Sequence, residues 1–162
     1  MWRLENPHVR LSTLWPPGGT RSTVTAMAEG RRLLGTVAGA TIIGGFLADW
    51  NRTHLFNPSW PPHAKFHDAQ SITLGSLLGA AGLYYVVRWA SREDRILAAG
   101  LPALFWAAQG ASFLFPQARG IEAEFPELVP RIRGVWINER FSAGTMLALG
   151  AIGLGFGFRE GR

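Results

Sequence analysis

Four long apolar stretches interrupt the charged residues of this 162-residue chain, and they decide which solvent the chain is built for. A helix rises about 1.5 Å per residue and the hydrocarbon core of a bilayer is about 30 Å thick, so roughly 20 apolar residues span it. Almost all of the charge lies between these stretches or at their ends. The sequence therefore predicts an all-α fold, an integral membrane four-helix bundle whose spans cover residues 33–49, 64–88, 96–115 and 141–158.

The distribution of arginine and lysine orients the predicted spans. Ten of the sixteen basic residues precede the first span, join the second span to the third or follow the fourth. The other six lie in the first and third connections, where they are largely balanced by glutamates, namely Glu122, Glu124, Glu127 and Glu139. Because basic residues are enriched on the cytoplasmic side, we expect both termini in the cytoplasm and a multi-pass protein of the cell membrane.

Glycine recurs within the predicted spans at helical spacing. Gly35 and Gly39 form one G-x-x-x-G pattern, and Gly75 and Gly79 form another. Helices in lipid associate through close van der Waals contact, which a glycine surface permits, so these residues predict tight packing between helices. The same faces make a homo-oligomer a reasonable expectation.

Composition excludes several classes of function. The net charge of +5 is typical of nucleic-acid binding in a soluble chain, but here the arginines flank spans and serve topology and lipid headgroups, so we expect no nucleic-acid partner. The absence of cysteine excludes disulfides, thiolate ligands and a cysteine nucleophile. Any bound metal must therefore use histidine, carboxylate or an added ligand.

Residues 1–30 form a separate N-terminal segment ahead of the transmembrane domain of residues 31–162. This segment contains four prolines and glycines in a row at residues 16–19 and no continuous apolar core. We expect a loosely ordered or interfacial tail, with Trp2 and Trp15 as membrane anchors. Met27 would make as sensible a start as Met1.

The first connection carries three of the four histidines, His54, His63 and His67. Pro61 and Pro62 suit the first turn of a helix, so we expect the second helix to begin there. His63 and His67 are four residues apart and therefore share one helical face, which Gln70 continues. Two imidazoles on one face can hold a metal ion, with His54 as a further ligand. The simpler alternative is that these histidines only bind headgroups, water or backbone.

Polar residues also occur at one depth of all four spans. They are Asp49, His67, Gln70, Gln109 and Glu139. A polar side chain in hydrocarbon must find a partner, so we expect these groups to converge in one pocket at the non-cytoplasmic mouth of the bundle. Trp106 would form part of an aromatic wall of that pocket.

Chain length, four spans and the run Ala64-Lys65-Phe66-His67 at the mouth of the second helix resemble the styrene oxide isomerase type of small membrane protein. The resemblance implies that His67 ligates haem b and that the iron acts as a Lewis acid on an epoxide oxygen. Two departures are present. Phe105, Trp106 and Gln109 occupy the region where the family has a tyrosine, and His63 is additional.

The haem hypothesis assigns roles to further residues. His67 would be the axial ligand, His63 would cap the rim, and the arginines Arg52 and Arg140 would pair with propionates. Gln109 or Asn57 would orient a small apolar substrate arriving from the lipid. The expected activity is isomerisation or oxidation of such a substrate, for example an epoxide.

Two other functions stay open at this stage. A non-catalytic membrane subunit or scaffold would bind partner helices through its glycine faces. A cofactor-free isomerase of a sterol or other lipid would move protons with Asp49, His67 and Glu139. Tolerance of His63→Ala combined with His67→Ala would favour the scaffold, and metal-free activity that follows the titration of one histidine would favour the acid–base enzyme.

Overall fold

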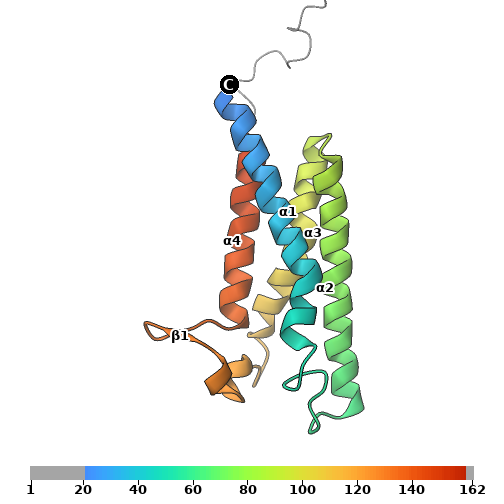
Figure 1. Ribbon diagram of the computed structural model, residues 1–162, viewed down its shortest axis with the longest axis vertical. Coiled ribbons are helices and arrows are strands. Elements are labelled where there is room, and N and C mark those ends of the chain that lie inside the picture. The colour runs from blue at the N-terminus through green and yellow to red at the C-terminus, as the bar shows by residue number, and fades with distance from the viewer. Residues whose placement is uncertain (1–20, 160–162) are drawn as a thin grey trace, which may run out of the picture.

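The computed structural model describes residues 21–159, and over this range the chain is a bundle of four long helices (Figure 1). These are α1 (Arg21–Asp49), α2 (Pro62–Arg88), α3 (Arg92–Ser112) and α4 (Glu139–Gly157). Neighbouring helices run in opposite directions, and each contacts the next in a ring that closes between α4 and α1. The prediction of an all-α fold with four helices is confirmed.

The helix boundaries agree with the sequence except at the first helix. α2, α3 and α4 each begin two to four residues before the predicted span. α1, in contrast, begins at Arg21, so the part of the predicted tail from residue 21 to 30 is helical. Gly30 packs against the backbone of α4 near Gly157, and this contact extends the helix beyond the apolar stretch. Residues 1–20, with Trp2 and Trp15, lie outside the described residues, as do residues 160–162.

Glycines allow the helices to approach closely inside the bundle. A Cβ atom added at Gly79 would lie 2.8 Å from the carbonyl oxygen of Ala38 on α1. One added at Gly82 would lie 2.6 Å from the ring of Pro102 on α3. Real Cβ atoms do not come this close, so both positions require glycine, and the predicted packing role is confirmed at Gly79. An added Cβ at Gly39 would meet no described heavy atom within 4 Å, so the tight packing predicted for that glycine is wrong. Gly79 and Gly82 face neighbouring helices of the same chain, so they do not support the predicted homo-oligomer. The homo-oligomer stays a prediction.

The interior holds alanines together with larger side chains such as Leu34 and Ile72, and the surface carries many large apolar side chains. Alanines such as Ala38, Ala98 and Ala143 are buried. Large apolar side chains on all four helices are exposed, among them Ile43, Leu47, Leu74, Leu77, Leu104, Phe141 and Ile152. Of the described helices, α1 and α2 are long and apolar enough to cross a membrane.

The connection between α3 and α4 is more ordered than a solvated linker. It holds two short 3-10 helices, η2 (Ile121–Ala123) and η3 (Pro126–Leu128), and a hairpin of strands β1 (Arg131–Ile132) and β2 (Val135–Trp136). Arg133 and Gly134 form the turn with φ of 50° and 87°, as a two-residue hairpin requires. This connection and the loop between α1 and α2 lie at the same end of the bundle (Figure 1).

Candidate functional site

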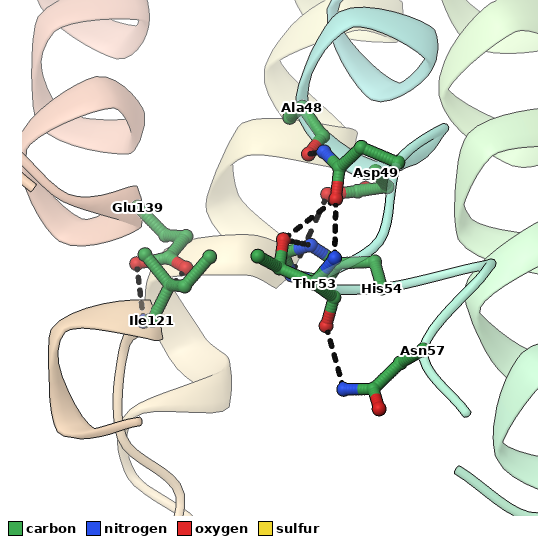
Figure 2. Close-up of polar contacts among 8 residues, drawn as sticks. Ala48, Asp49, Thr53, His54, Asn57, Ile121 and Glu139 are labelled. Atoms are coloured by element: carbon green, nitrogen blue, oxygen red, sulfur yellow. Dashed lines mark hydrogen bonds and ion pairs between the residues drawn. The ribbon is translucent and has the colours of Figure 1, made fainter. Parts of the chain in front are cut away.

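The end of the bundle formed by these two connections carries an ion pair between Asp49 and His54. α1 ends at Asp49, and the backbone carbonyl of this residue accepts hydrogen bonds from Asn51 and Leu55, so the chain folds back at once. The His54 Nε2 atom thereby comes to lie 3.8 Å from Asp49 Oδ1 (Figure 2). Both side chains are mostly buried, with exposed fractions of 18% and 25%.

Carboxylates from two other helices act on this pair. Asp68 on α2 and Glu139 on α4 both lie close enough to influence the charge of Asp49, and Asp68 also interacts with His54. Figure 2 shows Glu139 beside the pair, where its carboxylate accepts from the backbone N–H of Ile121 at 3.0 Å. Three helices therefore bring acidic groups to this end of the bundle. Glu139 interacts electrostatically with Asp49, and the histidine beside Asp49 is His54 and not His67.

Thr53 and Asn51 hold the His54 ring from its other side. The Thr53 hydroxyl donates to Asn51 Oδ1 at 2.6 Å, which uses its single proton. His54 Nδ1, at 2.9 Å from the same hydroxyl oxygen, is therefore assigned as the donor of that contact. His54 Nε2 is then the ring nitrogen that faces Asp49.

Two residues predicted to orient a substrate serve the fold instead. Asn57 is 5% exposed; its amide nitrogen donates to the Thr53 carbonyl and its oxygen accepts from Ser59. Gln109 donates to the Glu139 carbonyl at 2.9 Å and to the Ser142 hydroxyl at 3.0 Å, which ties α3 to α4. Both amide nitrogens therefore donate to groups of the fold itself.

His63 and His67 form a second histidine site on the outer face of α2. Their Nε2 atoms lie 3.1 Å apart, and both side chains are exposed. His67 Nδ1 lies 3.3 Å from Gln70 Oε1 and is assigned as the donor, because an amide oxygen can only accept. His67 Nε2 therefore presents a lone pair toward His63.

The prediction that His67 faces a pocket shared by the four helices is wrong. The buried face of α2 consists of Ile72, Gly75, Gly79, Gly82 and Val86. Gln70 precedes Ile72 by two residues, which is about 200° around a helix, so the stripe from His67 to Gln70 faces outward. Among residues 21–159, the polar and ring partners of His67 are His63, Phe66 and Gln70, all on α2.

A shallow groove continues from the histidine pair along the outer face of α2. It has a volume of about 390 Å³ and is lined by Phe66, Ala69, Gln70, Thr73, Leu74 and Leu77. Apart from Gln70 and Thr73, this lining is apolar. We call it the α2 groove.

The remaining predicted site residues lie apart from both histidine sites. Trp106 is 6% exposed and donates to Thr41 Oγ1 at 2.8 Å in the middle of the bundle, so it is a core residue and not a cofactor wall. The Arg140 guanidinium stacks on Phe113 at 4.5 Å. Arg52 is exposed. Within the described part of the chain, no three histidine or acidic residues are grouped to hold a metal ion, so His54 does not join His63 and His67 as a third ligand.

Comparison with known proteins gives one match. The profile of a family of unknown function, DUF6640, matches residues 33–159, which include nearly all of the four helices. The chain belongs to this family. No curated protein and no solved structure matches the chain. The family region contains both the Asp49–His54 pair and the His63–His67 pair, so both sites lie within its shared fold.

Proposed function

We propose that this protein is a multi-pass membrane protein in which all four helices cross the bilayer and both termini face the cytoplasm. The support is the large apolar surface, with exposed leucine, isoleucine or phenylalanine side chains on every helix, and the close glycine contacts inside the bundle. In water, an exposed apolar surface of this extent would drive association. In a bilayer, the same apolar surface faces the lipid tails.

We propose that the His63–His67 pair binds a metal ion at the non-cytoplasmic end of α2. Metal–nitrogen bonds to imidazole are about 2.0–2.1 Å long, so two nitrogens 3.1 Å apart suit one ion at an N–metal–N angle of roughly 100°. Gln70 holds the proton of His67 on Nδ1, which directs the Nε2 lone pair to the ion. A bound ion would take the place of the proton between the two Nε2 atoms, with the His63 proton then on Nδ1.

The α2 groove lies next to the proposed ion and would bind the substrate. With two protein ligands, the ion keeps other coordination positions for water or a substrate oxygen. The groove would hold the apolar part of a small lipid-soluble molecule beside it, and the ion would polarise an epoxide or carbonyl oxygen as a Lewis acid. The proposed activity is therefore isomerisation of a small apolar oxygen compound. The observation that carries it is the 3.1 Å separation of the two Nε2 atoms next to the groove.

Haem b, which the resemblance to styrene oxide isomerases implies, fits the His63–His67 site of a single chain less well than a metal ion does. The Gln70 contact suits His67 as an axial ligand. However, His63 Nε2 occupies the position where the iron would lie, and the described partners of His67 come from α2 alone. A single helix cannot cover both faces of a porphyrin. The pair therefore suits a single metal ion better than haem, and a visible spectrum decides whether haem is present.

The Asp49–His54 pair supports a second candidate function, a cofactor-free acid–base isomerase. Proton transfer requires an acid and a base held together, and here an imidazole lies against one carboxylate with two more nearby. His54 would take a proton from a lipid-soluble substrate and return it at another carbon. This candidate differs from the one expected from the sequence because His54 replaces His67.

Metal titration of the purified protein tests the proposed function. We expect calorimetry on chelator-treated protein to show one Zn²⁺ or Cu²⁺ ion per chain. His63→Ala combined with His67→Ala should abolish binding, while His54→Gln, the matched control, should leave it unchanged. Equal binding by the double variant would contradict the metal site. A Soret band that disappears in His67→Ala would show haem instead.

Deuterium incorporation separates the second candidate from the first. Lipid extract incubated in D₂O with the metal-free protein should gain deuterium if His54 moves protons, and His54→Gln should lose this activity. No incorporation by metal-free wild-type protein would eliminate the acid–base candidate.

A further inference from the structure

A pocket at the opposite end of the bundle is lined by arginine and tryptophan. It has a volume of about 470 Å³ and lies between α1 and the turn that joins α2 to α3. Its lining consists of Met27, Ala28, Arg31, Arg32 and Trp89. None of these residues belongs to the two histidine sites.

The two arginines differ in how much of their hydrogen-bonding capacity the fold uses. Arg31 donates from Nε to the Val86 carbonyl at 2.9 Å and from Nη2 to the Val87 carbonyl at 2.8 Å, which fixes its guanidinium at the end of α2. Its remaining N–H groups are left for another acceptor. Among residues 21–159, Arg32 pairs with Glu29, and its side chain is 75% exposed. The pocket therefore combines one positioned and one adjustable cation.

Trp89 also lines the pocket, and its backbone has an unusual conformation. It ends α2 with φ of 39° and ψ of 35°, in the left-handed region that residues other than glycine rarely adopt. The indole packs on Gly157 of α4, and the Arg95 guanidinium lies 5.8 Å from its ring. A strained residue that the surrounding structure holds in place is typical of functional positions. Here the conformation places an indole at the mouth of a cationic pocket.

We infer that this pocket binds the phosphate of an anionic phospholipid from the cytoplasmic leaflet. The guanidinium groups of Arg31 and Arg32 supply charge-assisted hydrogen bonds to phosphate oxygens. Met27 and Ala28 provide an apolar surface for the glycerol and the first part of an acyl chain, and tryptophan is enriched at the headgroup level. Basic pockets between spans on the cytoplasmic side suit such lipids. The inference depends on the membrane placement proposed above.

Native mass spectrometry of the full chain released from nanodiscs tests the inference. We expect phosphatidylglycerol to remain bound in preference to phosphatidylcholine, and Arg32→Gln to weaken this binding about fivefold. Arg133→Gln, a matched change at the other end of the bundle, should have no effect. Glu29→Gln removes the partner that competes for Arg32, so it should strengthen binding, and this variant does not depend on a destabilising change.

Each other outcome overturns the inference. Equal retention of both lipids, or no response to Arg32→Gln and Glu29→Gln, would exclude a headgroup site. Displacement of phosphatidylglycerol by millimolar inorganic phosphate would assign the pocket to a soluble phosphate compound. Failure of the chain to enter nanodiscs at all would contradict the membrane placement and not the pocket chemistry.

Discussion

The two ends of the bundle use their polar side chains in opposite ways. At the end where α2 turns into α3, the charged groups complete the fold: Arg95 donates to the Gly157 carbonyl at 3.1 Å, and Asp94 accepts from the N–H groups of Ala90 and Ser91. At the other end, His54 and His67 each keep one ring nitrogen directed at another titratable group.

We infer that the polar groups of the first end stabilise the fold and that the histidines of the second end are available for chemistry. A helix end leaves backbone groups without partners, and the arginines at the first end supply them. The second end meets the same need with the amides of Asn51 and Asn138, which bond the Ala48 carbonyl at the end of α1 and the Arg140 N–H at the start of α4, so its histidines are not used for this role. We therefore expect substitutions at the first end to unfold the protein and substitutions of the second end's histidines to change only its chemistry.

Labelling of single introduced cysteines should show the largest difference between the two ends, because one end should react and the other should not. The chain has no cysteine, so each introduced thiol is unique. In whole cells, a membrane-impermeant maleimide should label Glu124→Cys in the α3–α4 connection and should leave Arg92→Cys at the other end unlabelled. Labelling of both positions, or of Arg92→Cys alone, would contradict the proposed orientation.

Replacement of the buried arginine should give the largest loss of stability. Arg95 is 8% exposed, and Arg95→Met removes its hydrogen bond to the end of α4. Bonds that involve a charged group contribute about 1.5–3 kcal/mol, so thermal unfolding in detergent should shift by that free energy. The matched control is Arg92→Met, which removes an exposed guanidinium 5.1 Å from the Phe158 ring and should cost less than about 1 kcal/mol. Equal losses would show that burial of Arg95 is irrelevant.

Removal of the amide that joins α3 to α4 should have a smaller effect at the second end. Gln109→Met deletes the hydrogen bonds to Glu139 and Ser142 while keeping a side chain of similar length. A neutral hydrogen bond contributes about 1 kcal/mol, so the free energy of unfolding should fall by roughly that amount. Metal binding by His63 and His67 should not change in this variant. A joint loss of stability and binding would mean that the two features are coupled.

Acid should weaken the first end through Asp94. Burial alone would raise the pKa of Asp94, but hydrogen bonds from Ala90 and Ser91 and the charge of Arg88 outweigh burial and lower it below its ordinary value. A lowered pKa stabilises the fold fully above the unfolded-state pKa of about 3.9, and this contribution is lost as the pH falls through the folded value. Denaturation in detergent should therefore become easier below about pH 4. Asp94→Asn should be less stable at pH 7 and should lack this acid-dependent component.

The exposed histidine pair should give the smallest effect on stability. Among residues 21–159, the polar and ring partners of His63 and His67 all lie on α2, so His63→Ala combined with His67→Ala should change the free energy of unfolding by less than about 0.5 kcal/mol. A melting curve that coincides with the wild type in the absence of metal checks this. A loss of more than about 2 kcal/mol would assign the pair to the fold instead of to a metal site.

The sequence predicts the helices well because their apolar stretches are long and are separated by charge. It places the start of α1 too late because residues 21–32 are mostly polar, and the packing of Gly30 against α4 joins residues far apart in the chain. No local signal in the chain announces that contact.

The site is harder to predict, and α2 shows why. Both faces of this helix are apolar, so hydropathy does not tell which face is buried. Gly75, Gly79 and Gly82 mark the buried face, and their spacing would have placed Gln70 on the outer side and His67 at the edge of the buried face. The Asp49–His54 pair depends on a loop that folds back on the end of α1, which residue spacing does not reveal.

Electron paramagnetic resonance of the Cu²⁺-loaded protein tests the proposed metal site most directly. If both imidazoles bind one ion, the spectrum should carry hyperfine structure from two equivalent nitrogens, and His63→Ala or His67→Ala alone should remove one of them. His54→Gln should leave the spectrum unchanged. A wild-type spectrum without nitrogen hyperfine structure, or one that survives loss of both His63 and His67, would contradict the account.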